Sequence, residues 1–144
     1  MDSRAVYPGT FDPFTAGHRD VVDRVRRLFA QVIVLVAVNP DKQPAGSVDN
    51  RAAAIRAGLP PDWSNVVVAA WAGLTADYCH IHRVGVLVRG VRNQTDLRHE
   101  YPLAVLNEQM GVTTLLVPAR PDLAAVSSTA VRRSPAARSP HPAP

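Results

Sequence analysis

The segment from Gln31 to Val38 restricts the fold of this chain more than any other, because after its first residue it contains only Val, Ile, Leu and Ala. A continuous aliphatic run without polar alternation is typical of a strand buried on both faces of a parallel sheet. The run is far too short to cross a bilayer, which takes about 20 apolar residues. Parallel neighbours are joined by crossovers, usually helices, so helix and strand should alternate along the chain.

The rest of the sequence alternates in this way. Four further strands are expected at Arg4 to Tyr7, Asn65 to Ala70, Gly85 to Val88 and Thr113 to Val117. Helices are expected at Arg19 to Phe29, Val48 to about Ala57, Thr75 to His82, Thr95 to Met110 and, as a short capped turn, Ser127 to Arg133. Ser47 is the expected N-cap of the second helix, and Pro102 predicts a kink or a late start in the fourth. The pattern predicts a Rossmann-like, doubly wound α/β fold with a five-stranded parallel sheet.

Length and composition indicate a single globular domain. The 144 residues, 47% of them hydrophobic and 19% charged, are enough to bury a core. We assign residues 1–133 to this domain and residues 134–144 to a disordered tail, because four of those last eleven residues are proline. Cys79 is the only cysteine, and no apolar stretch like a signal peptide follows Met1, so a reducing cytoplasm is the expected location.

The charge balance suits an anionic ligand, since the net charge is +4 and the isoelectric point is near 10. Nucleic acid would be one such ligand, but the arginines are scattered along the chain and form no dense tract, which argues against it. Lys42 is the only lysine among the sixteen Lys and Arg residues. It lies in an expected loop, where a compact and mobile ammonium can reach a ligand.

The stretch from Tyr7 to His18 carries the clearest functional signal. It connects an expected strand to an expected helix and is rich in Gly and Pro, as turns are. It also carries the hydroxyl of Thr10 and the imidazole of His18, the latter where the helix should begin. Helix N-termini have unpaired N–H groups and a partial positive charge, which attract phosphate. We therefore expect a polyphosphate-binding turn here, with His18 stabilising developing charge.

Polar groups also follow the other expected strands. Lys42 comes after the second strand, Arg89 and Arg92 follow the fourth directly, and Ser127 to Thr129 lie beyond the fifth. In open parallel sheets, ligands bind outside the carboxyl ends of the strands. These groups are therefore expected to converge with Thr10 and His18 at one edge of the sheet.

The types of residue at this expected site limit the reactions that it could catalyse. No His or Cys pair has metal-ligand spacing, because His80 and His82 would lie on different faces of a helix as solvated residues. There is no P-loop motif, and Ser127 and Ser128 lack a nucleophile elbow. A cationic site without a covalent nucleophile suits phosphoryl or nucleotidyl transfer, in which catalysis is mostly positioning and charge neutralisation.

The same residues carry a resemblance to a known family. The sequence Tyr7-Pro-Gly-Thr-Phe-Asp-Pro, with Thr15-Ala-Gly-His18, resembles the T/H-x-G-H signature of the nucleotidyltransferase superfamily in the form of the bacterial phosphopantetheine adenylyltransferases. Further motifs follow in that family's order, namely Asn39-Pro-Asp-Lys42, Arg89-Gly-Val-Arg92, Asp96 with Glu100, and Val126-Ser-Ser-Thr129. The resemblance covers roughly residues 4 to 133.

This resemblance implies transfer of AMP from ATP to 4'-phosphopantetheine, a homohexamer, and Mg²⁺ held mainly by the ATP phosphates. The residues it places in catalysis are Thr10, His18, Lys42 and Arg92. Those it places on the acceptor are Thr10, Lys42, Thr75 and Arg89. Those it places on ATP are Thr10, Phe11, His18, Gly90, Val91, Arg92, Glu100, Leu123, Ala124, Ala125, Val126, Ser127, Ser128 and Thr129. No metal ligand from the protein is expected.

Two other classes remain open at this stage. Thr75, His99 and Pro102 depart from the residues that the family usually has at those positions. A related transferase could use another phosphate or phosphonate acceptor, with ATP or CTP. A degenerate copy could bind a nucleotide without turnover.

Overall fold

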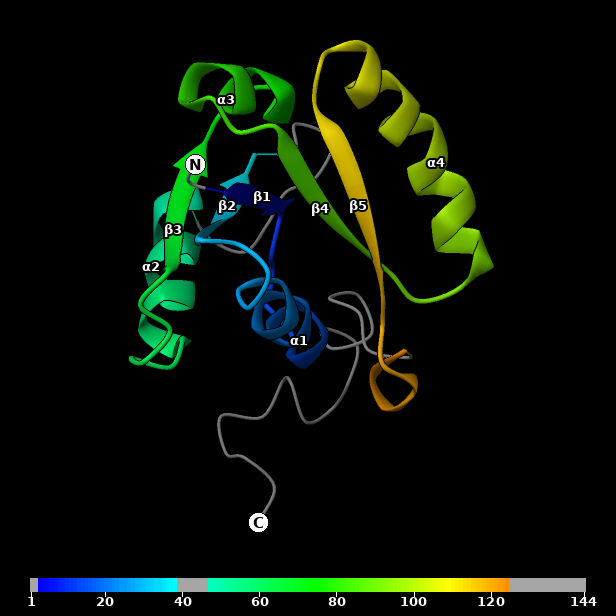
Figure 1. Cartoon of the computed structure of the whole chain (residues 1–144). Coiled ribbons are helices and arrows are strands. Elements are labelled where there is room, and N and C mark those ends of the chain that lie inside the picture. The colour runs from blue at the N-terminus through cyan, green and yellow to red at the C-terminus, as the bar shows by residue number, and fades with distance from the viewer. Residues whose placement is uncertain (1–2, 39–46, 125–144) are drawn as a thin grey trace.

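The computed structural model describes residues 3–38 and 47–124, which form a five-stranded parallel sheet with helices on both faces (Figure 1). The strands are β1 (Arg4–Gly9), β2 (Gln31–Ala37), β3 (Val66–Trp71), β4 (Val86–Val91) and β5 (Thr113–Pro118). The helices are α1 (Ala16–Val25), α2 (Val48–Gly58), α3 (Thr75–His82) and α4 (Gln94–Gln109), and a short 3-10 turn, η1 (Pro121–Leu123), ends the described part. The predicted Rossmann-like doubly wound sheet is confirmed.

The strand order is β3-β2-β1-β4-β5, so the direction of winding reverses between β1 and β4. β1 pairs with β2 along its whole length, from Arg4 opposite Gln31 to Gly9 opposite Val36. Its pairing with β4 is restricted to Val6 opposite Leu87. The two central strands therefore diverge towards their carboxyl ends, where ligands bind in sheets of this kind.

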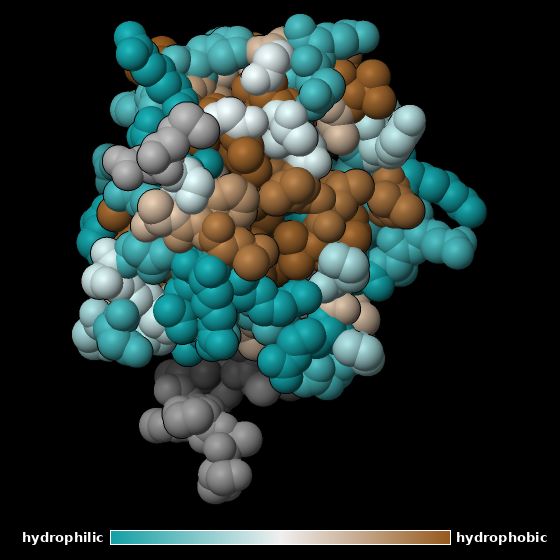
Figure 2. Space-filling view, viewed as in Figure 1, coloured by the Kyte–Doolittle hydropathy of each residue, from teal (hydrophilic) through white to brown (hydrophobic). Residues whose placement is uncertain are grey.

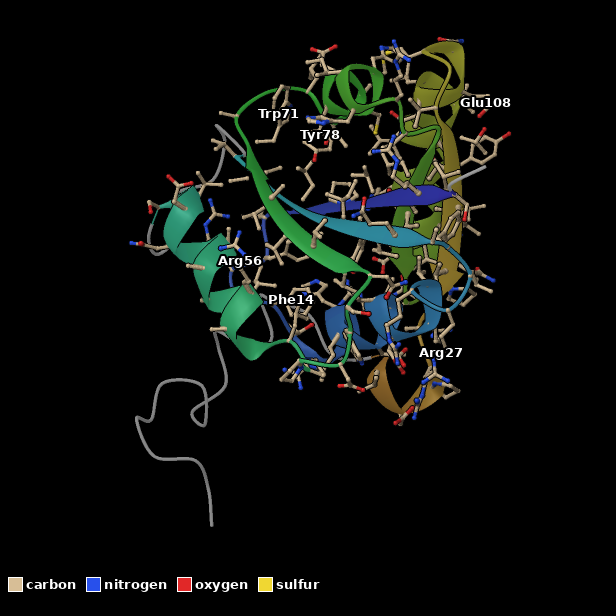
Figure 3. The ribbon with its side chains drawn as sticks, turned by 60° about the vertical axis from the view of Figure 1, so that its left-hand side comes forward. Phe14, Arg27, Arg56, Trp71, Tyr78 and Glu108 are labelled. Carbon is tan, nitrogen blue, oxygen red and sulfur yellow. The ribbon has the colours of Figure 1, made fainter. Side chains whose placement is uncertain are left out.

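The two faces of the sheet are covered differently. On one face, Val21, Val22 and Val25 of α1 and Ile55 of α2 are buried against Val residues of β2. On the other face, Tyr78 and Cys79 of α3 pack on residues such as Leu35 (Figure 3 labels Tyr78 beside Trp71). α4 also crosses this second face, yet none of its residues is buried. Helices α1 and α2 therefore bury apolar residues against the sheet of this chain, whereas α4 buries none of its residues.

Several predicted boundaries are confirmed, and some are wrong. α3 runs from Thr75 to His82 as expected, and Ser47 caps α2 by accepting a hydrogen bond from the N–H of Asn50 at 3.1 Å. α1 begins at Ala16, which places His18 inside the helix. β4 extends to Val91, so Arg89 belongs to the strand and does not follow it.

α4 begins at Gln94, upstream of Pro102, so the expected late start at this proline is wrong, and the expected kink stays a prediction. No helix in residues 3–38 or 47–124 is long and apolar enough to cross a membrane. The helix expected at Ser127 to Arg133 and the Pro-rich tail lie outside the described residues, so the division at residue 133 stays a prediction.

Candidate active site

The turn from β1 into α1 is fixed by a reciprocal pair of hydrogen bonds. Thr15 is the N-cap of α1, and its Oγ1 accepts from the N–H of His18 at 3.2 Å. In return, the Thr15 N–H donates to Nδ1 of His18 at 2.9 Å. Nδ1 is thereby an acceptor, which assigns the ring proton of a neutral imidazole to Nε2. His18 thus presents an N–H donor from the third position of α1, whereas the sequence predicted it at the start of the helix, directly before Arg19.

His18 is surrounded by aromatic rings and by positive charge. The ring centroids of Phe11 and Phe14 lie 5.0 and 5.5 Å from that of His18. Burial, together with the charges of Arg89 and Arg92, lowers the pKa of His18 to about 4. The imidazole is consequently neutral at pH 7, and it acts as a hydrogen-bond donor without becoming a charge that must be neutralised.

Phe11 fixes the path of the loop that carries Thr10. Its φ of 51° lies in the left-handed region, which is unfavourable for a large side chain. Phe11 as a whole is 5% exposed, and its ring packs edge-on against that of Tyr7, with centroids 5.3 Å apart. A Cβ added at Gly9 would lie 2.7 Å from the Phe11 ring, so only glycine fits beneath it. Arg51 of α2 adds a hydrogen bond from Nη1 to the Thr10 carbonyl.

Arg89 belongs to β4, and its guanidinium is held by groups of both β1 and α4. Its Nη1 donates to the Pro8 carbonyl at 2.8 Å, while its Nε and Nη2 donate to the Glu100 carboxylate at 2.9 to 3.2 Å. Burial opposes the charged form, but Glu100 outweighs it and raises the pKa of Arg89 above its ordinary value. Burial also raises the pKa of Tyr7, despite the nearby charge of Arg89. The family resemblance assigned Arg89 and Glu100 to different ligands, and the structure joins them in one ion pair.

Arg92 is oriented by the first turn of α4. The Asp96 carboxylate accepts from its backbone N–H and Nε, both at 2.9 Å, and from Nη2 at 3.3 Å. Asn93 caps the helix by accepting from the N–H of Asp96 at 2.9 Å. Partial burial opposes ionisation of Asp96, but hydrogen bonds and charge from Arg92 hold the pKa of this carboxyl below its usual value. Roughly a third of the Arg92 side chain faces solvent, at 35% exposure.

The structure brings part of the predicted set together. Thr10 and Phe11 lie on the β1–α1 turn, and His18 lies in the first turn of α1. The other members of this group come from β4, the residue that follows it and α4, namely Arg89, Gly90, Val91, Arg92 and Glu100. A Cβ at Gly90 would lie 3.4 Å from Val21 Cγ2, which shows how closely β4 passes the first helix. Their contacts with ligands stay predictions.

Other predicted residues lie apart from this group or outside the described chain. Thr75 is the first residue of α3, which packs on the opposite face of the sheet from α1. Leu123 and Ala124 lie at the end of the described chain, in and just after η1. The residues outside the described ranges are Lys42, Ala125, Val126, Ser127, Ser128 and Thr129.

Sequence reasoning missed Arg51, whose guanidinium braces the loop. The sequence did contain a sign of this role. Arg51 and Ile55 are four positions apart, so both lie on the buried face of the predicted helix. A charged residue on such a face needs a buried acceptor. The acceptor itself, a backbone carbonyl of the β1–α1 loop, could not be found from the pattern of α2 alone.

The chemistry available at this edge is hydrogen-bond donation and positive charge. A neutral imidazole N–H and two guanidinium groups lie around the carboxyl ends of β1 and β4. Within residues 3–38 and 47–124, no three His, Cys, Asp or Glu side chains are grouped to hold a metal ion. Such a site stabilises spreading negative charge on a phosphate without forming a covalent bond to it.

Comparison with known proteins gives consistent matches. Residues 6–134 match the cytidylyltransferase-like family. A protein named phosphopantetheine adenylyltransferase from Actinobacillus pleuropneumoniae serotype 3 is 40% identical over 92% of this chain and 84% of its own length. A protein of the same name from Clavibacter michiganensis subsp. michiganensis is 44% identical over the same shares.

Solved structures agree in fold. A putative nicotinate-nucleotide adenylyltransferase from Vibrio parahaemolyticus superposes with a TM-score of 0.61 at 19% identity, covering 92% of this chain and 85% of that one. A bifunctional NMN adenylyltransferase/ADP ribose pyrophosphatase from Francisella tularensis gives a TM-score of 0.66 at 16% identity over 92% of this chain and 42% of that one.

Proposed function

Because this chain belongs to the phosphopantetheine adenylyltransferase family, within the cytidylyltransferase-like proteins, we propose that it transfers AMP from ATP to 4'-phosphopantetheine in coenzyme A biosynthesis. The observation that carries the proposal is the neutral His18, with Nε2–H available, beside Arg89 and Arg92 at the carboxyl edge between β1 and β4. The products are dephospho-coenzyme A and pyrophosphate.

The reaction is a displacement at the α-phosphorus of ATP. An oxygen of the acceptor's 4'-phosphate forms a bond to this phosphorus, and the bond to the bridging oxygen of the β-phosphate breaks, releasing pyrophosphate. His18 donates from Nε2 to an α-phosphate oxygen as its charge increases, and remains neutral throughout. Arg92, whose side chain is partly open to solvent, attracts the β- and γ-phosphates.

The remaining roles follow the family pattern. Thr10 and Lys42 hold the acceptor phosphate against the ATP, and Thr75 and Arg89 line the pantetheine side. The nucleotide is held by Phe11, Gly90 to Arg92, Glu100 and Leu123 to Thr129. Arg89 is well prepared for its role, because Glu100 and the Pro8 carbonyl already fix its guanidinium.

Mg²⁺ enters this proposal bound to the triphosphate. Asp96 and Glu100 are already engaged with Arg92 and Arg89, so the described part of the site offers no pair of open carboxylates for a resident cation. A phosphate-bound ion fits such a site, because Mg²⁺ commonly keeps water and phosphate ligands. It would reduce the negative charge on the phosphates of bound ATP.

The enzyme assembles as a homohexamer in the cytoplasm. Seven large apolar residues of α4, its C-cap and β5 are exposed, namely Leu97, Tyr101, Leu103, Val105, Leu106, Met110 and Leu115. Figure 2 shows an apolar area on the face where α4 lies, and patches of this kind commonly mark interfaces between proteins. Sedimentation of the purified chain measures the mass, and a monomeric mass would contradict the proposal. The lone buried Cys79 is in keeping with a reducing compartment.

Pyrophosphate release tests the reaction directly. Purified protein is incubated with ATP or CTP, each combined with 4'-phosphopantetheine, nicotinate mononucleotide or no acceptor. We expect turnover with ATP and 4'-phosphopantetheine, and a background rate in every other combination. Turnover only with CTP or with another acceptor would identify a related transferase. Nucleotide binding with no turnover in any combination would identify a non-catalytic homologue.

A further inference from the structure

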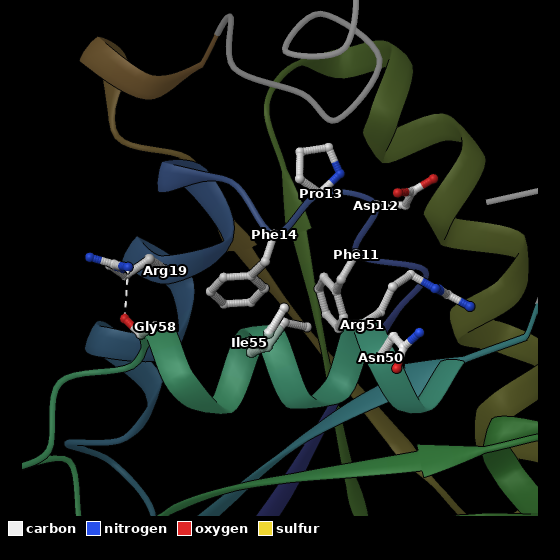
Figure 4. Close-up of a pocket in the computed structure, with 10 residues that line it drawn as sticks. Phe11, Asp12, Pro13, Phe14, Arg19, Asn50, Arg51, Ile55 and Gly58 are labelled. Atoms are coloured by element: carbon white, nitrogen blue, oxygen red, sulfur yellow. Dashed lines mark hydrogen bonds between the residues drawn. The ribbon is translucent and has the colours of Figure 1, made fainter. Parts of the chain in front are cut away.

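Arg51 is a buried cation whose only side-chain hydrogen bond among the described residues ends on the turn that carries Thr10. It lies on α2 and is 7% exposed. Its Nη1 donates to the Thr10 carbonyl, while its buried Nε has no partner in residues 3–38 and 47–124. Figure 4 shows its side chain rising from α2 beside Phe11. No reactive role assigned above involves this residue.

Packing does not account for an arginine at this position. A buried guanidinium carries a large desolvation cost, and an unsatisfied donor adds to it. The neighbours of Arg51 on the same side of α2, Ala52 and Ile55, are apolar and make the ordinary contacts of a core helix. An apolar side chain would therefore give a comparable or more stable fold, and the benefit of Arg51 lies in the bond that it makes.

That bond fixes a peptide with little other support. Thr10 leaves β1 after Gly9, and the next residue, Phe11, has the unfavourable φ of 51°. The left-handed conformation costs of order 1–3 kcal/mol and persists only where the surroundings enforce it. Burial of the Phe11 ring holds one side of this turn, and the bond from Arg51 holds the carbonyl that directly precedes it.

We propose that Arg51 is a positioning residue that acts through Thr10, holding the Thr10–Phe11 peptide so that the Thr10 hydroxyl and N–H meet the phosphates of the two substrates. This inference rests on the proposed function, which assigns Thr10 to those phosphates. The gain is in the transition state, because a displacement of the order of 1 Å at a phosphate ligand costs about a hundredfold in rate.

The chain offers a matched control on the same helix. Arg56 of α2, labelled in Figure 3, also donates from Nη2 to a backbone carbonyl, that of Val68 in β3, at 2.9 Å, but it is exposed and its bond ends on a strand and not on the β1–α1 turn. Both variants, Arg51→Ala and Arg56→Ala, remove one arginine-to-carbonyl bond from α2. Only the first removes a bond to Thr10.

The experiment compares wild type with Arg51→Ala, Arg51→Lys and Arg56→Ala in steady-state pyrophosphate release and in melting temperature. We expect Arg51→Ala to lower kcat about 30- to 100-fold, with Arg51→Lys within about tenfold of wild type because its ammonium still reaches the carbonyl. Arg51 also lines an open cavity with Phe14 and Ile55 (Figure 4), so added guanidinium ion can enter the space left by the alanine. It should restore at least part of the lost kcat, and only in Arg51→Ala.

Turnover of Arg51→Ala within threefold of wild type overturns the inference. Equal losses in Arg51→Lys and Arg51→Ala with no rescue by guanidinium also overturn it, because that result is expected of a purely structural residue. If wild type itself releases no pyrophosphate, the proposed function fails separately. Amide NMR then decides on Arg51, since Thr10 and Phe11 resonances must shift in Arg51→Ala and stay unchanged in Arg56→Ala.

Discussion

The turn between β1 and α1 holds its polar groups by apolar packing and by hydrogen bonds to uncharged groups and backbone, whereas the turn between β4 and α4 holds Arg92 by an ion pair. In the first, His18 lies among Phe11 and Phe14 and is uncharged. In the second, Arg92 and Asp96 form a charged pair at the start of a helix that has no buried residue. Both turns lie at the carboxyl edge of the two central strands.

These two ways of holding polar groups meet two different requirements of a phosphate site, namely precise placement of a donor and reversible binding of charge. A rigid apolar cage fixes one donor in one place, which suits the reacting phosphorus, where small displacements are costly. An exposed ion pair keeps a charge ready but lets it exchange partners, which suits binding and release of a polyphosphate. Changes in the first turn should therefore affect turnover, and changes in the second should affect binding and stability.

The largest effect is expected for His18→Ala. Turnover should fall by about two to four orders of magnitude, because a donor aimed at developing charge is lost. The KM for ATP should change much less. Pyrophosphate release measures both, with His80→Ala on the exposed surface of α3 as the control. If His18→Ala turned over within threefold of wild type, His18 would have no catalytic role. The proposed contrast between the two turns would then also be wrong.

The next largest effect is expected for Glu100→Gln. The amide keeps the shape of the side chain but leaves Arg89 without its counter-charge, which should cost about 2–3 kcal/mol of unfolding free energy. The exposed Glu108, labelled in Figure 3, is the only other glutamate, and Glu108→Gln should cost under about 0.5 kcal/mol. Urea unfolding measures both variants. Equal midpoints would mean that the Arg89–Glu100 pair contributes nothing to the fold.

A smaller effect, confined to binding, is expected for Arg92→Ala. The dissociation constant for ATP should rise about tenfold while that of the acceptor stays within twofold, since a single charge-assisted contact is worth about 1.5–3 kcal/mol. The loss should shrink as salt increases, because the side chain is partly exposed. Calorimetric titration provides the numbers, and Arg98→Ala on α4 is the control. An unchanged ATP affinity contradicts the role of this turn.

The smallest effect is a change in the titration of His18. NMR of the ring should give a pKa of about 4, and Arg92→Gln should raise it by removing a neighbouring charge. Since the unfolded chain titrates near 6.5, it binds the proton more tightly, so this histidine lowers stability as the pH falls from about 6.5 to about 4. In His18→Gln, the free energy of unfolding should fall less over this pH range than it does in wild type. A measured pKa above 6 would break the argument for a neutral donor.

The sequence predicted best those features that depend on local patterns. The aliphatic run of β2, the full extent of α3 and the Ser47 cap all follow from residues close together in the chain. β4 was predicted to end at Val88, whereas pairing of Gly90 with Val117 of β5 continues the strand to Val91. The late start expected at Pro102 failed because Asn93 caps the helix far upstream.

The unpredicted part of the site consists of bonds between segments that are distant in sequence. Arg89 meets the Pro8 carbonyl, and Arg51 meets the Thr10 carbonyl. A backbone carbonyl has no sequence signature, so such acceptors are visible only in three dimensions. The motif around His18 indicated which group acts, but the bond to Thr15 that assigns its proton required the structure.

The neighbouring positions of β1 and β4 also set an order of assembly during protein synthesis. Val6 pairs with Leu87, and the carbonyl of Pro8 accepts a hydrogen bond from Arg89, which lies 81 residues further along the chain. Contacts of such long range are slow to form, because a large loop must close first. When β1, β2 and β3 have left the ribosome, the first three strands can pair, yet the phosphate-binding edge still lacks its fourth strand. A nascent chain therefore acquires this edge late, and nucleotide binding would report completed folding.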